Sequence, residues 1–162
     1  MDNKLFIQNI DRDDAAKGRH IDPGPNSMLI QISDPGHGFP TPGFKHFKEI
    51  HQFEFLDVED ELNFDEEVKI SQEQANKLVA LLQHALDNRM NVIVHCFAGI
   101  CRSGAVVEVG EAMGFAHCDK FRAPNLRVKR MMFNALGWGY TNEMEQADKE
   151  QMRTSLLGWG KW

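Results

Sequence analysis

The sequence predicts an α/β protein in which a central, mostly parallel sheet is flanked by helices. Residues 92–96, VIVHC, form a nearly continuous apolar run, which is typical of a strand buried on both faces of a parallel sheet. Short apolar runs of strand type lie early and in the middle of the chain, and longer segments with helical periodicity follow them. Strands with helices packed around them give a layered α/β fold.

Three further strands are predicted upstream of this run. Residues 5–10 and 28–33 are short apolar runs, and the polar segment between them ends in IDPGPNS, so it is predicted as an irregular connection. Residues 34–43 contain three prolines and three glycines and are predicted as a loop. The segment that starts at His51 alternates phenylalanines and predicts a strand that ends near Asp57.

Four helices are predicted, and the first has the clearest boundary signal. Ser71 and Gln74 have the spacing of a capping box, and the leucines that follow recur at helical intervals over residues 71–88. Glycines mark the expected ends of the other three helices. These helices are 102–113, ended by Gly114; 125–136, ended by Gly137; and 142–157, ended by Gly158.

Composition narrows the classes of partner. The 162 residues carry a net charge of −6, which argues against nucleic acid as a partner because a phosphate-backbone binder normally has a basic face. No apolar run is long enough to cross a bilayer, and the N-terminal residues lack the pattern of a signal peptide. We therefore expect a cytoplasmic protein without a membrane partner, organised as a single domain over residues 1–162.

Three cysteines, Cys96, Cys101 and Cys118, are present. Their odd number does not suit the disulfide framework of a secreted protein. Cys96 and Cys101 are too far apart for a zinc knuckle, and no second pair follows at finger-like spacing. Reduced thiols and no metal site are therefore expected.

The segment after the buried strand carries the chemistry. Cys96 and Arg102 stand at the two ends of a loop with five residues between them, where a strand enters and a helix leaves. The backbone N–H groups of such a loop converge into an anion-binding nest, and the helix N-terminus adds a positive dipole end. The guanidinium group of Arg102 is suited to bidentate binding of phosphate. The predicted phosphate-binding residues are Phe97, Ala98, Gly99, Ile100, Cys101 and Arg102.

The same surroundings favour the thiolate form of Cys96, which makes it a candidate nucleophile. Gly99 suits a tight bend where the backbone approaches a ligand. Ser103 is expected to donate a hydrogen bond to the sulfur of Cys96, and His95 is expected to orient the loop rather than to contact substrate. The predicted catalytic group is therefore a thiolate beside an arginine that binds phosphate.

The string HCFAGICRS, residues 95–103, resembles the signature H-C-x-x-G-x-x-R-[ST] of the protein-tyrosine and dual-specificity phosphatases. Over residues 28–137 the order of segments is similar to small atypical phosphatase-like proteins of phages and bacteria, whereas the residues on either side match no family pattern. The resemblance implies a single phosphatase domain with a dual-specificity-phosphatase-like fold. It also implies hydrolysis of phosphotyrosine through a phosphocysteine, with no metal or organic cofactor.

In this family an aspartate on a loop after the preceding strand is the general acid. Asp60 lies 36 residues before Cys96 and ends the string LDVED, so the resemblance makes it the predicted acid. Asp57 is the runner-up because it directly follows the phenylalanine-rich strand. Asp65 has a suitable spacing but lacks that strand context.

Several alternatives stay open from the sequence. The substrate is either phosphotyrosine, with or without phosphoserine and phosphothreonine, or a non-protein ester such as a nucleotide, an RNA 5′-phosphate or a phosphoinositide. The loop has no lysine, which disfavours polyanionic lipids. A non-catalytic phosphate-binding module would keep the loop and bind phosphate without hydrolysing it.

The role of Cys101 is also open: it is either a packed thiol or the partner of Cys96 in a protective disulfide. The expected partner is a phosphorylated protein or a small phosphomonoester.

Overall fold

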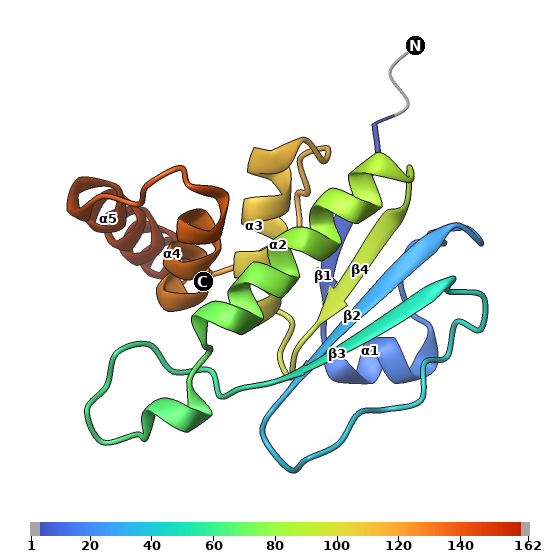
Figure 1. Cartoon of the computed structure of the whole chain (residues 1–162), viewed down its shortest axis with the longest axis horizontal. Coiled ribbons are helices and arrows are strands. Elements are labelled where there is room, and N and C mark those ends of the chain that lie inside the picture. Colours follow the sequence, from blue (N-terminus) through green and yellow to red (C-terminus); the bar gives the residue numbers. More distant parts are fainter. Residues whose placement is uncertain (1–3, 160–162) are drawn as a thin grey trace.

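The computed structural model describes residues 4–159, and its four strands form one sheet in the order β1-β4-β2-β3 (Figure 1). Every neighbouring pair of strands is parallel, which confirms the predicted α/β class and parallel sheet. The strands are β1 (Ile7–Ile10), β2 (Ser27–Ser33), β3 (Glu49–Glu54) and β4 (Asn91–His95).

Helices cover both faces of the sheet. The main core forms where α2 (Gln72–Asp87), α3 (Arg102–Met113) and α4 (Leu126–Leu136) pack on one face. On the other face, α1 (Arg12–Lys17) packs with a smaller cluster of buried residues. Because both faces are covered, the central strands β2 and β4 need apolar side chains on both sides. The outermost helix is α5 (Asn142–Trp159), next to α4 in Figure 1.

The start of α2 follows the sequence pattern closely. The hydroxyl of Ser71 accepts a hydrogen bond from the backbone N–H of Gln74 (3.1 Å), and the side-chain oxygen of Gln74 accepts one from the N–H of Ser71 (3.0 Å). This is the predicted capping box, and it satisfies two N–H groups that have no partner within the helix. Leu78 and Leu82 are among the residues that then face the core. The prediction of this helix is confirmed.

Three boundaries differ from the sequence prediction. The segment predicted as an irregular connection contains α1. The carboxylate of Asp11 caps the first turn of this helix by accepting a hydrogen bond from the N–H of Asp14 (2.6 Å). The strand predicted to end near Asp57 ends at Glu54, because the N–H of Leu56 turns away from the sheet to the carbonyl of Val68 (2.7 Å). Helix α5 continues through Gly158, the predicted end, to Trp159.

The strand order determines where a site can form. β4 lies between β1 and β2, so the chain leaves the carboxyl end of a central strand with a neighbour on each side. In the register, His95 lies opposite Ile10 of β1 and Gln31 of β2. Ligands of open parallel sheets bind at this kind of position, outside the carboxyl ends of strands where the order reverses. The signature loop follows His95 directly.

None of the helices in residues 4–159 combines the length and the hydrophobicity that a bilayer-spanning helix requires.

Candidate active site

The loop from Cys96 to Cys101 joins β4 to α3. Cys96 is buried, with 3% of its surface exposed. Its Sγ atom lies 3.2 Å from the hydroxyl oxygen of Ser103, in the first turn of α3. The structure therefore places the predicted nucleophile and the predicted hydroxyl donor in direct contact.

The loop carbonyls are held outward by groups elsewhere in the chain. A trans peptide directs its C=O and its N–H in opposite directions, so outward carbonyls leave the next N–H groups free to point inward. This arrangement is the nest that an oxyanion needs. The contacts are Arg12 N–H with the Phe97 carbonyl (3.1 Å), Asn9 Nδ2 with Gly99 (2.7 Å), Ala123 N–H with Ile100 (3.2 Å) and Asn125 N–H with Cys101 (2.9 Å).

Gly99 is required by both conformation and space. Its φ angle is 73°, in the left-handed region that favours glycine. A Cβ atom there would lie 2.4 Å from the carbonyl carbon of Ile10 and 2.5 Å from the nitrogen of Asp11. The end of β1 is therefore packed directly against the bend of the loop.

Arg102 is anchored at one nitrogen and unsatisfied at another. It is 4% exposed, and its Nη1 donates to the carbonyl of Phe55 and to the carboxylate of Asp34, both over 2.7 Å. Its Nε is buried and has no hydrogen-bond partner in the described part of the chain. An unsatisfied buried donor costs on the order of 1–3 kcal/mol, and a bound oxyanion would remove that cost.

Cys96 and Arg102 open into a cavity of about 380 Å³. Its walls are mostly apolar, and its polar groups are the thiols, the guanidinium group and two carboxylates. Phe97 stands at the rim with 71% of its surface exposed. The lining residues are Asp34, Leu56, Asp57, Val58, Phe64, Cys96, Phe97, Ala98, Cys101 and Arg102.

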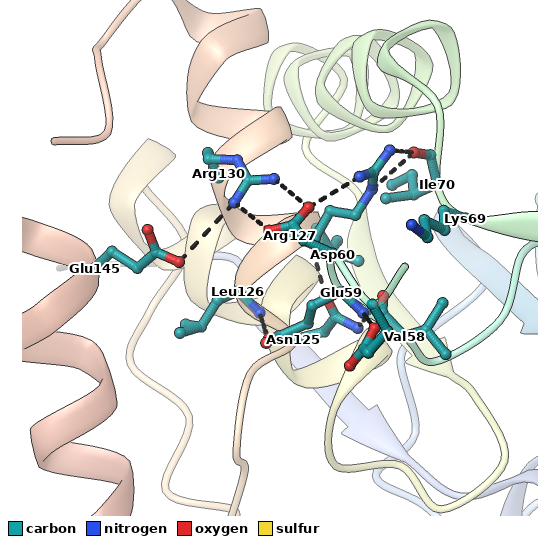
Figure 2. A network of polar contacts seen from close by, with 12 residues as sticks. Val58, Glu59, Asp60, Lys69, Ile70, Asn125, Leu126, Arg127, Arg130 and Glu145 are labelled. Atoms are coloured by element: carbon teal, nitrogen blue, oxygen red, sulfur yellow. Dashed lines mark hydrogen bonds and ion pairs between the residues drawn. The ribbon is translucent and has the colours of Figure 1, made fainter. Parts of the chain in front are cut away.

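The two candidate acids have different surroundings. Asp57 lines the cavity, and its Oδ1 accepts a hydrogen bond from Nδ2 of Asn125 over 2.9 Å. Asp60 is absent from the cavity lining and is held by Arg130 (2.9 and 3.1 Å) and Arg127 (3.0 Å) of α4, as Figure 2 shows. Hydrogen bonds from Arg130 hold the pKa of Asp60 below its usual value, with further lowering from Arg127. A carboxylate kept ionised in this way is a poor proton donor.

His95, the predicted loop-orienting residue, is fully buried. Its Nδ1 lies 3.3 Å from the carbonyl oxygen of Cys96. Burial lowers the pKa of His95 to about 4, so the imidazole is neutral near neutral pH and donates from one nitrogen only. The side chain thus contacts the backbone of the loop and adds no charge to it.

Cys101 also lines the cavity, but it differs from Cys96 in its surroundings. Burial, followed by the negative charge and hydrogen bond of Asp57, raises the pKa of Cys101 to about 12. It therefore remains a neutral thiol near neutral pH. Cys96, Cys101 and Cys118 are free thiols in this structure.

Four residues that shape the site were not identified from the sequence. Asn9 and Arg12 come from the region that matched no family pattern, and Asp34 and Asn125 were seen only as parts of a loop and a helix start. One local signal was available for Asn9, because an amide within an apolar strand is buried only when hydrogen-bonded. Its side chain is 1% exposed and donates to the carbonyls of Gly99 and Phe121.

No known protein-family model matches the sequence, and a search of curated proteins gives no match. Solved structures do share its shape. The structure of a human tyrosine phosphatase-like serine/threonine/tyrosine-interacting protein aligns with a TM-score of 0.51 at 15% identity, covering 94% of this chain and 93% of that one. Human DUSP28 aligns with a TM-score of 0.49 at 13% identity, covering 94% of each chain. The first of these alignments shows that the chain has the fold of a tyrosine phosphatase-like protein, which confirms the predicted phosphatase fold.

Proposed function

We propose that this protein is a cysteine-dependent phosphomonoesterase that hydrolyses phosphotyrosine through a phosphocysteine intermediate. One observation carries the proposal: a buried cysteine and Arg102, whose Nε has no hydrogen-bond partner among the described residues, line the same cavity as Asp57. The reaction needs three groups: a nucleophile, a group that binds phosphate, and a proton donor. No metal takes part in any step below.

In the first step the thiolate of Cys96 attacks phosphorus, and the P–O bond to the leaving group breaks. The inward N–H groups of the loop and the guanidinium group of Arg102 bind the three non-bridging oxygens, where negative charge is concentrated. Asp57 gives its proton to the departing phenolate oxygen. The products of this step are the free phenol and a phosphocysteine.

In the second step water attacks the phosphorus of the phosphocysteine, and Asp57 accepts the proton of that water. The P–S bond breaks, its electron pair returns to sulfur, and inorganic phosphate leaves. The hydroxyl of Ser103, 3.2 Å from Sγ, donates to the forming thiolate and stabilises it as a leaving group.

Asp57 replaces Asp60 as the proposed acid. The support is positional, because Asp57 lines the cavity with Cys96 whereas Asp60 is engaged by two arginines of α4.

The proposed substrate preference follows from the residues that form the walls of the cavity. Leu56, Val58 and Phe64 line the same cavity as Cys96 and suit the flat apolar ring of an aryl phosphate.

The test is hydrolysis of p-nitrophenyl phosphate by reduced protein in a metal chelator, with Cys96→Ser and Cys118→Ser alongside. We expect turnover by the wild type, loss of turnover in Cys96→Ser, and retention in Cys118→Ser, whose thiol lies outside the cavity lining. Binding of vanadate without turnover would instead support the non-catalytic phosphate-binding module. Absence of both turnover and vanadate binding would refute a phosphate site.

A further inference from the structure

A second, smaller cavity of about 90 Å³ adjoins the active site. Asp34, Phe97 and Arg102 line both cavities, so the two share a wall. The second cavity adds its own cationic side chain, Arg12, which the proposed reaction does not use. Its lining residues are Arg12, Ile32, Ser33, Asp34, His37, Phe97 and Arg102.

Among the described residues, the side chain of Arg12 is held only by uncharged partners. Its Nη1 donates to the hydroxyl of Ser33 (3.3 Å) and to the carbonyl of Gly38 (3.2 Å). These bonds fix the guanidinium group at the cavity but leave its charge without a counter-ion. A partly desolvated charge of this kind attracts an anion more strongly than a fully hydrated one.

The carboxylate of Asp11 accepts a hydrogen bond from the N–H of Asp14, and three other nearby carboxylates are paired with other arginines. Asp13 and Asp14 pair with Arg19, and Asp34 pairs with Arg102. Within residues 4–159, no ion pair of Arg12 with a carboxylate is found. The wall of the second cavity thus holds two guanidinium groups and one paired aspartate, a surplus of one positive charge.

The two guanidinium groups are held by consecutive residues at the end of β2. Ser33 binds Arg12 and Asp34 binds Arg102, and consecutive Cα atoms are about 3.8 Å apart. The exposed ring of Phe97 borders both cavities. A substrate whose first phosphate binds Arg102 can therefore place a second anion at Arg12. A short linker between the two groups would pass over the ring of Phe97.

We propose that the Arg12 cavity is a second anion subsite, and that, among the phosphomonoesters that enter the active site, those with a second phosphate a few bonds from the first bind more tightly. This proposal rests on the proposed function, since it concerns the substrates of the same site. The guanidinium group is the chemistry that recognises the second phosphate, through charge and paired N–H donors.

The test measures binding to Cys96→Ser by titration calorimetry, so that turnover is not needed. The probes are the monophosphates and bisphosphates of ethane-1,2-diol, propane-1,3-diol and butane-1,4-diol at one ionic strength. We expect at least one bisphosphate to bind about tenfold more tightly than its monophosphate, the gain typical of a charge-assisted hydrogen-bond pair. Adding Arg12→Ala should bring that ratio close to one, and Arg12→Lys should retain part of it.

Arg19→Ala is the matched control, because Arg19 is another arginine near α1 that pairs with Asp13 and Asp14 and lies outside both cavities. It should keep the full bisphosphate preference. Equal affinity for every monophosphate and bisphosphate pair, or a preference that survives Arg12→Ala, would overturn the subsite. The wild type could lack p-nitrophenyl phosphatase activity while Cys96→Ser still binds a bisphosphate more tightly than its monophosphate in an Arg12-dependent way. That result would reject the proposed hydrolysis but support the anion subsite.

Discussion

Asn125 donates a hydrogen bond from its side-chain amide to the carboxylate of Asp57 over 2.9 Å, although the two residues are 68 positions apart. The same amide group donates to the carbonyl of Val58 (3.1 Å), and its oxygen caps α4 by accepting from the N–H of Val128 (3.0 Å). One side chain thus begins a helix and fixes the segment that carries the proposed acid. The position of Asp57 depends on α4 as well as on its own loop.

Asn125→Ser separates these two roles. Serine caps helices about as well as asparagine, but its shorter side chain does not reach Asp57. We expect kcat to fall about tenfold while KM and the melting temperature change little, because loss of an orienting hydrogen bond affects the proton-transfer step. Steady-state kinetics and thermal unfolding check this. A matching rise in KM, or a large loss of stability with unchanged kcat, would contradict a positioning role.

Asp57→Asn should lower kcat for phenyl phosphate by about 10²-fold or more, the usual contribution of a general acid. The effect should be smaller for p-nitrophenyl phosphate, whose leaving group needs less protonation. Asp60→Asn should leave kcat within about threefold, because it removes only partly exposed ion pairs with Arg127 and Arg130. A larger loss of kcat in Asp60→Asn than in Asp57→Asn would return the assignment to Asp60.

Cys101 should resist alkylation near neutral pH. Burial and the charge of Asp57 raise the pKa of Cys101 to about 12, and only the thiolate reacts with iodoacetamide. Mass spectrometry of peptides after treatment at about pH 7 should find Cys96 modified and Cys101 intact, with both modified in denaturant. The same reasoning predicts slow disulfide formation between them, since attack on an oxidised Cys96 also requires a thiolate. Equal alkylation of both cysteines in the folded protein would exclude this account.

His95 should make stability fall under mildly acidic conditions. Burial depresses the pKa of His95 from 6.5 to about 4 in the folded protein, so the unfolded chain binds more protons between these values. The free energy of unfolding therefore decreases as the pH falls from 6.5 towards 4, by up to about 3 kcal/mol. Below pH 4 both the folded and the unfolded protein bind this proton, so His95 causes no further decrease. Urea denaturation of the wild type and of His95→Asn at several pH values checks the slope. Equal slopes in the two proteins would assign the effect to other groups.

Local patterns were enough to predict much of the fold. The capping box of Ser71 and Gln74, the apolar β4 and the glycine after α3 each depend on residues close together in sequence. The signature loop belongs to the same category, because its strand, bend and helix are consecutive. Helix α1 was missed, although Asp11 and Gly18 mark its ends, because six residues are too few to show a helical period.

Contacts between distant segments could not be predicted. No local pattern indicates that β1 pairs with β4 rather than with β2, yet this pairing brings Asn9 and Arg12 to the loop. The surroundings of the two candidate acids also depend on such contacts. The string LDVED favoured Asp60, but Arg127 and Arg130 come from a helix far along the chain and engage that carboxylate.

The contacts of Asn9 and Arg12 with the loop carbonyls mean that the signature alone does not make a binding site. A fragment that starts at residue 28 would retain every residue of HCFAGICRS but lose the donors that hold the carbonyls of Phe97 and Gly99 outward. Those oxygens would then be free to turn towards the phosphate and repel it. β1 is an edge strand of the sheet, so substitutions that loosen its pairing with β4 would abolish the proposed activity while every proposed catalytic residue remained intact.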